Sequence, residues 1–390
     1  MMNVLVIGDG ARAHALCWKL SESPVLEELY CAPGNIGVGL IAECVPISLK
    51  AVHTIASFCE ENDIDFIIVS NTQTMSIGIV DMLNRNGFAT FGPDMGAVRL
   101  ETSKAFSREV CQAGNIPMAK FVRVTDQASA DAHIDASELP IVVKGDFAVD
   151  GSRVAICKTK EEAKAAVAAH FAAGDLEIFL EEFLTGPEVS YCAVTDGHIV
   201  LPMTSATDDW DPEGPGLYRG SLSPAPSVTP EIEKQILQKI LRPTINAMKN
   251  MRRPFKGLLN TRLILTAEGP KVIDYKVRFS DPEWQAIVLR INGDLIPALI
   301  SSYDEMLERF DPFRWHPGSA AALVMRAEGA NATTEKIGIA IDTIEAEDED
   351  IVVYRSNDEK ELNVTATGAD LADIRKRLYA AASRVLDMVR

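Results

Sequence analysis

The chain lacks any apolar run long enough to cross a membrane as a helix. Its 390 residues are 47% hydrophobic, yet none of its segments reaches the roughly 20 consecutive apolar residues that a spanning helix needs. The first residues also carry no basic segment ahead of an apolar stretch. We therefore expect no signal peptide, no membrane partner and a cytoplasmic location.

Patterned cysteines are missing too. The seven cysteines are scattered along the chain and form no C-x-x-C pair. This spacing argues against a disulfide framework and against a zinc site. We expect the cysteines to be small buried apolar side chains in a reducing compartment.

Positive charge is scarce in this sequence. There are 38 Lys and Arg residues against 56 Asp and Glu residues, which gives a formal net charge of −18. Binding to nucleic acid by counterion release requires a surplus of basic residues, so we expect no nucleic-acid partner. A phosphate ligand would require the available cations to be gathered in one place.

Strands and helices alternate over residues 1–100. The strands are continuously apolar, and helical spacing or a glycine turn follows each of them. This pattern predicts an α/β fold that begins with a doubly wound parallel sheet domain, in which ligands bind at the carboxyl ends of the strands. The predicted strands are residues 3–7, 28–32, 66–69 and 89–91.

The remaining chain divides into three regions of mixed helix and strand. We place their boundaries at 101–188, 189–314 and 315–390, with the last region a small α+β domain. We expect single helices at 101–114 and 230–250, and a long loop at 207–226.

A glycine turn follows the first predicted strand. The stretch from Gly8 through Gly10 to Arg12 lacks the third glycine of a dinucleotide fingerprint. Two interpretations stay open. The turn either serves only a tight strand–helix connection, or its backbone N–H groups bind an anion at a helix N-terminus.

The order of the motifs along the chain is more specific than any one motif. It includes VLVIGDGARAHAL at 4–16, FGPDMGAVRLETSKAF at 91–106 and KVIDYKVRFSDPEWQ at 271–285. Further segments of this order lie at 32–37, 140–144, 180–188, 201–205 and 222–226. In these motifs nearly the whole chain resembles the phosphoribosylamine–glycine ligase family, also called glycinamide ribonucleotide synthetase, of the ATP-grasp superfamily.

The resemblance implies a fold and a reaction. Regions 101–188 and 189–314 become the two α+β subdomains of an ATP-grasp module, which uses ATP and Mg²⁺. The family joins a carboxylic acid, glycine, to an amine through an acyl phosphate, in purine biosynthesis. Such chemistry needs no side-chain nucleophile, in keeping with the lack of a Ser–His–Asp or Cys–His pattern. We expect a small carboxylic acid (glycine or another amino acid) and an amine as substrates, and a monomer or homodimer.

Two lysines from separate segments suit a polyphosphate. Lys104 begins a predicted helix and Lys144 ends a predicted strand. The resemblance assigns both to phosphates, the segment after Leu180 to adenine, Glu188 to ribose and the loop after Gly145 to a lid. The ATP-binding residues implied in this way are Lys104, Lys144, Ser152, Arg153, Glu181, Phe183, Leu184 and Glu188.

The resemblance also implies the residues of the acid and amine site. Arg278, whose guanidinium offers a two-pronged contact to phosphate or carboxylate, and Asp281 are the implied catalytic residues. The implied substrate-binding residues are Gly8, Gly10, Arg12, Asn35, Arg278, Pro282 and Glu283.

Several positions depart from the family pattern. The family places a glutamate and an asparagine as magnesium ligands where this chain has Asp274 and Lys276. We predict Asp274 as the metal ligand, but an ammonium group at Lys276 has no lone pair for a metal. Asp150 adds negative charge to the lid loop, and residues 70–75 replace a substrate-binding segment. Three hypotheses remain: a ligase for the family's own substrates, a ligase for a different acid or amine, and a catalytically impaired relative that binds nucleotide in a regulatory or structural role.

Overall fold

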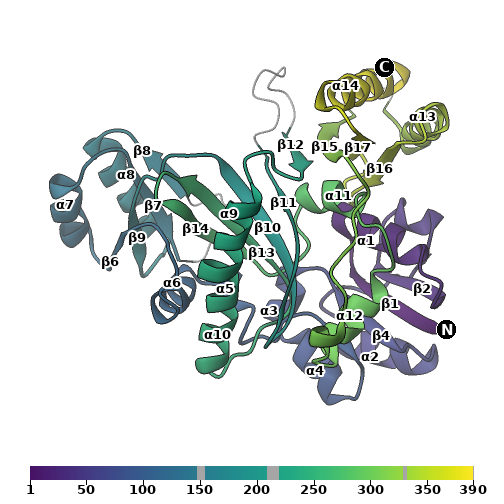
Figure 1. Cartoon of the computed structure of the whole chain (residues 1–390), viewed down its shortest axis with the longest axis horizontal. Helices are drawn as coiled ribbons and strands as arrows, with labels where there is room; N and C mark the ends of the chain where they lie inside the picture. The colour runs from purple at the N-terminus through teal and green to yellow at the C-terminus, as the bar shows by residue number, and fades with distance from the viewer. Residues whose placement is uncertain (147–153, 209–218, 328–331, 390) are drawn as a thin grey trace.

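The computed structural model describes residues 1–146, 154–208, 219–327 and 332–389. Over these residues the chain forms one parallel and three antiparallel sheets. Figure 1 shows the sheet of strands β6 to β9 at one end of the molecule and the N-terminal parallel sheet near the other, with a central sheet between them. Among the described residues, no helix is long and apolar enough to span a membrane.

The N-terminal sheet is parallel and carries helices on both faces, as predicted. Side chains alternate along its central strand, so that Val4 and Val6 pack towards one face while Leu5 and Ile7 pack towards the other. Helix α1 (Ala11–Ser21) covers the first face, and helices α2 (Val52–Glu61) and α4 (Ile79–Arg85) cover the second. The strand order is β3-β2-β1-β4-β5, with β1 Met2–Gly8, β2 Leu26–Pro33, β3 Glu43–Cys44, β4 Phe66–Val69 and β5 Thr90–Phe91.

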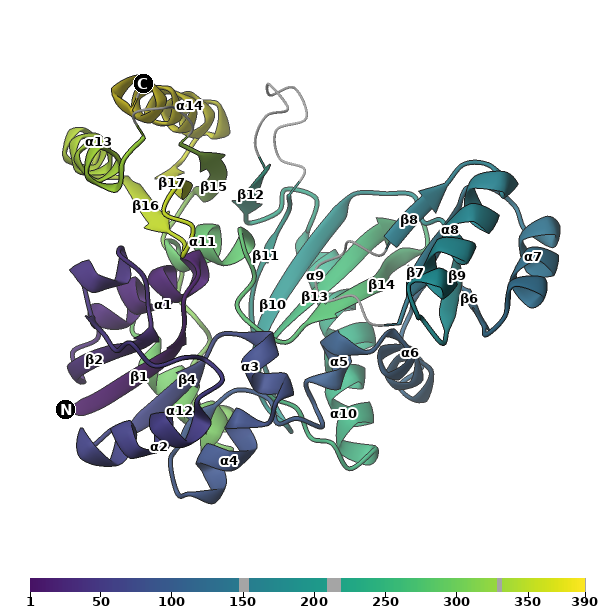
Figure 2. The same cartoon turned by 180° about the vertical axis from the view of Figure 1, so that it is seen from behind.

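The next sheet belongs to a lobe with its own hydrophobic core. Its strands are antiparallel in the order β6-β9-β7-β8, with β6 Phe121–Val124, β7 Ile141–Gly145, β8 Val154–Cys157 and β9 Ile178–Glu182. Helices α7 (Gln127–Ala136) and α8 (Lys160–Ala172) pack against each other on this sheet (Figure 2). A capping box between Thr159 and Glu162 fixes the start of α8.

The central sheet shares its cores with the N-terminal domain. Its strand order is β11-β10-β13-β14, with β10 Glu188–Asp196, β11 Val200–Ala206, β13 Lys256–Thr266 and β14 Gly269–Lys276. One face packs on α9 (Pro230–Ile236) and α10 (Arg242–Asn250), which a π-helical turn at Leu237–Leu241 joins. The other face packs on α11 (Glu283–Val288) and α12 (Ile296–Tyr303).

The C-terminal sheet includes a strand from a distant part of the chain. Its order is β12-β15-β17-β16, with β12 Arg219–Ser223, β15 Ser319–Arg326, β16 Ile351–Arg355 and β17 Glu361–Gly368. Helices α13 (Thr334–Glu347) and α14 (Leu371–Val389) complete its core. The prediction of an uninterrupted loop at 207–226 is therefore wrong at β12, because this short strand is stabilised by pairing with β15.

The predicted helix at 101–114 is two helices. Helix α5 (Arg99–Thr102) ends before Ser103, whose backbone is extended, and α6 (Lys104–Ala113) begins after it. The Ser103 hydroxyl accepts a hydrogen bond from Phe106 N, so this residue caps α6 instead of continuing a helix. Gly78, which has a positive φ of 85°, separates the short helix α3 (Thr72–Ser76) from α4.

Buried His14 joins the N-terminal domain to the C-terminal sheet. Its Nδ1 accepts a hydrogen bond from Arg355 N at 2.9 Å, and its ring meets Tyr354 edge-on. A Cβ on Gly37 would lie only 2.4 Å from the imidazole, so glycine is required there for close approach. Burial, with a further contribution from Arg355, lowers the pKa of His14 to about 4.

This lowered pKa predicts a specific loss of stability in acid. The unfolded chain takes up a proton at His14 near pH 6.5, whereas the folded chain does so only near pH 4. The contribution of neutral His14 to the free energy of unfolding is therefore complete above pH 6.5. About 3 kcal/mol of it is lost as the pH falls from 6.5 to about 4. The difference in unfolding free energy between wild type and His14→Gln, measured with urea, should shrink as the pH falls. Exposed His53→Gln serves as the control, and a difference for His14→Gln that stays constant with pH would contradict the account.

Candidate functional site

A cavity of about 670 Å³ opens where three parts of the chain meet. The loops after β1 and β4 form one wall, residues 276–283 form a second, and strands of the C-terminal sheet form a third. Because β2 and β4 flank β1 on opposite sides, this is the switch point of the parallel sheet, where ligands of such sheets bind. The predicted site residues in its wall are Gly10, Arg12, Arg278, Asp281 and Glu283.

The glycine turn after β1 contains two different glycines. A Cβ on Gly8 would lie 2.2 Å from the Ser70 hydroxyl, so close packing alone requires glycine there. A Cβ on Gly10 would find nothing closer than 3.9 Å, and Gly10 precedes α1 without a side-chain cap. Gly10, Ala11 and Arg12 line the cavity and no side chain caps the start of α1, which favours the anion-binding interpretation for Gly10.

Eight charged side chains form two neighbouring sets of ion pairs beside this cavity, which we together name the basic network. Its members are the cations Lys104, Arg108, Lys144, Lys276 and Arg278 and the carboxylates Glu101, Glu181 and Asp274. Five cations therefore face three carboxylates, and this group carries two net positive charges. The protein gathers positive charge locally despite its overall charge of −18.

Glu181 on β9 holds one half of the basic network. Its carboxylate accepts from Arg108 of α6, with the Arg108 Nε at 2.9 Å, and lies 2.6 Å from Lys144 Nζ of β7. Burial lowers the pKa of Lys144, and Glu181 opposes that shift only in part. Burial alone would raise the pKa of Glu181, but Lys144 and Arg108 outweigh it and hold this pKa below its ordinary value.

Asp274 and Glu101 hold the other half. Lys104, the first residue of α6, donates to Asp274 Oδ1, and Lys276 Nζ lies 3.6 Å from Asp274 Oδ2. Buried Glu101 has Lys276 Nζ at 3.8 Å and Arg278 Nε at 3.5 Å from its Oε1, while its Oε2 accepts from Val277 N. Burial would raise the pKa of Asp274, but Lys104 and Lys276 hold it well below its ordinary value.

Asp146 fixes the position of Lys104. Its carboxylate accepts from Ala105 N at 2.7 Å and from the Ser103 hydroxyl at 3.2 Å, and its carbonyl accepts from Lys104 N at 3.2 Å. The end of β7 is thereby tied to the N-terminus of α6. As predicted, Lys104 begins a helix and Lys144 lies on a strand, and the fold brings both lysines to neighbouring residues of β14, Ile273 and Asp274.

The surroundings of Asp274 do not fit a protein-bound divalent cation. Magnesium prefers oxygen ligands, but each oxygen of this carboxylate faces an ammonium group. Over the parts of the chain that the structure covers, three or more His, Cys, Asp or Glu side chains are nowhere grouped as a metal site. The metal role of Asp274 stays a prediction that this arrangement does not favour.

The predicted catalytic pair lies in the wall of the cavity. Asp281 Oδ2 accepts from Arg12 Nε at 2.8 Å, and Asp281 Oδ1 accepts from Gln285. Arg278 Nη1 donates to Phe279 O at 3.2 Å, so its guanidinium is oriented by its own loop. Arg12, from the glycine turn, and Arg278 thus approach the same cavity from two domains.

Buried Glu283 lies close to other acids. Burial raises its pKa to about 8, and the nearby carboxylate of Asp208 adds to the shift. Within the described chain, no hydrogen bond reaches Glu283 Oε2. A protonated carboxyl group with a free oxygen in a cavity wall can donate to or accept from a bound polar substrate.

The other predicted residues have varied surroundings. Glu188 is exposed and paired with Arg262. Asn35 uses its side chain within the protein, donating to Asp9 O and Arg355 O and accepting from Gly37 N. Pro282 precedes α11, Phe183 is 38% exposed and Leu184 is buried. The predicted Ser152 and Arg153, and the acidic Asp150, lie outside the described residues.

Sequence reasoning missed three charged residues of the site. Arg108 lies four residues after Lys104, on the same face of α6, and that spacing was a usable signal. Arg262 interrupts the apolar strand β13, and Glu101 is a buried acid inside the motif at 91–106. A charge inside a largely apolar element therefore marked the site only at Arg262.

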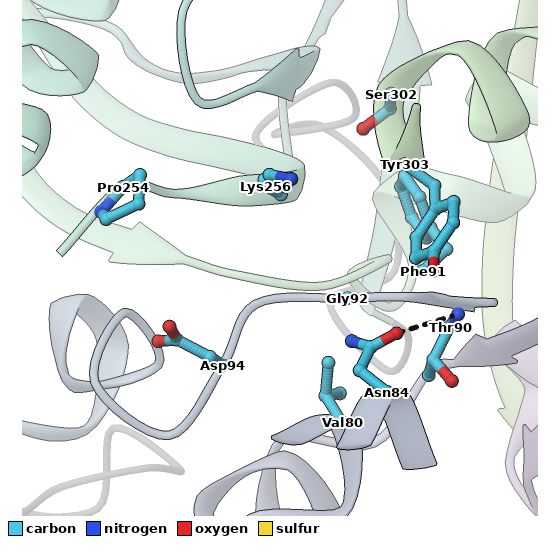
Figure 3. A pocket seen from close by; sticks show the side chains of 10 residues that line it. All are labelled: Val80, Asn84, Thr90, Phe91, Gly92, Asp94, Pro254, Lys256, Ser302 and Tyr303. Atoms are coloured by element: carbon cyan, nitrogen blue, oxygen red, sulfur yellow. Dashed lines mark hydrogen bonds between the residues drawn. The ribbon is translucent and has the colours of Figure 1, made fainter. Parts of the chain in front are cut away.

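A second cavity, of about 430 Å³, lies away from these residues. Figure 3 shows Asn84 accepting a hydrogen bond from Thr90 N at its edge, with Lys256 and Tyr303 on other sides. None of the predicted site residues is among the described residues of its wall. This cavity is therefore not the candidate site.

Comparison with known proteins identifies the family. Residues 2–101 match the phosphoribosylglycinamide synthetase N domain, and residues 102–284 match the ATP-grasp (A) domain of phosphoribosylglycinamide synthetase. Phosphoribosylamine–glycine ligase of Mesorhizobium japonicum is 37% identical, over 98% of this chain and 95% of that protein. The enzyme of the same name from Brucella melitensis is 35% identical, over 97% and 94%.

Solved structures agree on the fold. A crystal structure of phosphoribosylamine–glycine ligase from Thermotoga maritima superposes with a TM-score of 0.78 at 21% identity, over 98% of this chain and 96% of that one. A crystal structure of the biotin carboxylase–beta-gamma-ATP complex from Campylobacter jejuni superposes with a TM-score of 0.72 at 12% identity, over 98% of this chain and 91% of that one. The chain belongs to the phosphoribosylamine–glycine ligase family of ATP-grasp ligases.

Proposed function

We propose that this protein is an ATP-dependent ligase that joins a small carboxylic acid to an amine through an acyl phosphate. The observation that carries the proposal is the basic network, which concentrates two net positive charges beside a cavity of about 670 Å³. The acid's carboxylate takes the terminal phosphoryl group of ATP, and ADP leaves. The amine then attacks the acyl carbon, loses a proton and displaces phosphate to form the amide. Positioning and charge neutralisation are what such a transfer requires of a protein.

The lysines of the basic network face the nucleotide in this proposal. Lys104 and Lys144 exchange part of their contact with Asp274 and Glu181 for phosphate oxygens. Arg108 stays on Glu181 and keeps that buried carboxylate paired. Backbone groups around Phe183 and Leu184 receive adenine, and Glu188 releases Arg262 to accept from ribose hydroxyls. Magnesium, which the family uses with ATP, would have to arrive on the phosphates, because Asp274 is already paired.

The cavity between the three domains holds the acid and the amine. Arg278 binds the reacting carboxylate or the transferred phosphate, and Asp281 keeps Arg12 oriented towards the cavity. The N-terminus of α1 at Gly10 offers N–H groups to an anionic part of the amine substrate. Glu283, in the wall next to Asp281, meets the amine.

The acid and the amine that this ligase joins are to be identified by experiment. Glycine and phosphoribosylamine, the substrates in the relatives' names, are the first pair to test. The replaced segment 70–75 contributes Asn71, Thr72 and Gln73 to the cavity wall, which favours a changed amine. The ammonium groups on both oxygens of Asp274 favour the alternative of a nucleotide-binding relative without catalysis.

An assay of ADP release separates these hypotheses. The protein should release ADP only when an acid and an amine are both present, in a screen that crosses amino acids with amines and includes phosphoribosylamine. The matched variant is Arg278→Lys, which keeps the positive charge but removes the two-pronged contact. If the protein is an active ligase, this variant should lower kcat by roughly tenfold or more. ATP binding without ADP release from any pair would support the non-catalytic alternative.

Lys144→Ala tests the phosphate assignment. We expect ATP affinity to fall by about tenfold or more, because the variant removes a buried cation from the phosphate side of the site. The variant should stay folded, since Glu181 keeps Arg108 as its partner. Lys158→Ala, at an exposed position just after β8, is the matched control. Calorimetry that finds unchanged ATP affinity in Lys144→Ala would show that this lysine does not contact phosphate.

A further inference from the structure

Lys276 lies between the cavity and Asp274. Its ammonium group is 3.6 Å from Asp274 Oδ2 and 3.8 Å from Glu101 Oε1, and its side chain is only 13% exposed. Lys276 lines the cavity, whereas Asp274 is not among the described residues of the wall. A ligand that enters the cavity therefore meets the ammonium of Lys276 before the carboxylate of Asp274.

The other oxygen of Asp274, Oδ1, also accepts hydrogen bonds from the protein. Oδ1 accepts from Lys104 Nζ and, at 2.9 Å, from the backbone N of Tyr275. A carboxylate held in this way offers a divalent cation no oxygen that is free of a competing positive charge. The competing charges belong to the protein, so a soluble ion would have to displace an ammonium group to bind.

Arg262 brings another positive charge to the same wall. It lies opposite Asp274 in the antiparallel register of β13 and β14, lines the cavity and pairs with Glu188. Lys276 and Arg262 together carry two positive charges, which equals the charge of one divalent cation. Both are covalently tethered, so their local concentration does not depend on the concentration of metal in solution.

We infer that Lys276, supported by Arg262, takes the place of a protein-bound divalent cation and neutralises the polyphosphate of the bound nucleotide. The ammonium group can donate up to three hydrogen bonds to phosphate oxygens without the octahedral geometry that magnesium demands. The inference rests on the proposed function, because it takes the basic network as the nucleotide site. Its consequence is that ATP binding by this chain depends little on magnesium.

The test compares ATP affinity in magnesium and in EDTA by calorimetry. For the wild type we expect the two dissociation constants to differ by less than about threefold. In Lys276→Asn the amide supplies an oxygen and releases Asp274 Oδ2, so ATP affinity should fall by about tenfold or more when magnesium is removed. Electron paramagnetic resonance with Mn²⁺ provides a second measurement: Lys276→Asn should bind the ion more tightly than the wild type.

Two control variants separate charge from fold. Lys276→Arg keeps the positive charge and should retain metal-independent binding. Lys271→Asn changes another lysine of β14, which pairs with Glu268 at 2.9 Å and is not among the described residues of the cavity wall. It should behave as the wild type. Thermal unfolding of each variant confirms that it is folded before its affinity is compared.

The outcomes that overturn the inference differ from those that overturn the proposed function. If wild type and Lys276→Asn lose ATP binding equally in EDTA, the inference is wrong while ATP remains the nucleotide. If Lys276→Arg becomes as magnesium-dependent as Lys276→Asn, charge at this position is not the cause and the inference is again wrong. If the wild type binds no ATP under any of these conditions, the proposed function is wrong and the inference falls with it.

Discussion

The arrangement of this site depends on three carboxylates, buried Glu101 and Glu181 and partly buried Asp274, that hold five cations in place. Placing a charged side chain in a protein interior is costly, and removing one partner of a buried ion pair leaves an uncompensated charge. Each carboxylate of the basic network therefore needs at least one cationic partner, and each has two. The basic network also connects separate elements. Glu181 comes from the lobe of strands β6 to β9, Lys104 and Arg108 come from α6, and Asp274 comes from the central sheet. That lobe has its own hydrophobic core, so these ion pairs help to set its position on the rest of the molecule.

The same network explains how an acidic protein can bind a polyphosphate. The excess of 56 acidic over 38 basic residues is a property of the whole sequence, whereas the basic network sets five cations against three carboxylates. The N-terminal and central sheets share their hydrophobic cores, which gives the cavity two rigid walls. The C-terminal sheet supplies the third wall and is fastened through the hydrogen bond between His14 and Arg355. Packing thus positions the walls, and electrostatics decides what can bind between them.

Much of this was predictable from the sequence, because periodic patterns report local structure well. The strand at 66–69 and the lysines at the start of α6 and on β7 were predicted correctly. What could not be predicted depends on contacts between distant residues. Strand β12 exists through its pairing with β15, and the partners of Asn35 come from two other segments. The pairing of Lys276 with Asp274 and Glu101 could be found only in the structure. The sequence showed only that a lysine stands where the family has an asparagine that binds magnesium.

The most direct test of this account is a crystal structure of the protein with a non-hydrolysable ATP analogue and magnesium. The account predicts terminal phosphate oxygens within about 3 Å of the Nζ atoms of Lys104, Lys144 and Lys276, with Arg108 still bonded to Glu181. A nucleotide bound in another cavity would contradict it. So would a divalent ion coordinated by Asp274 with Lys276 turned away from the phosphates.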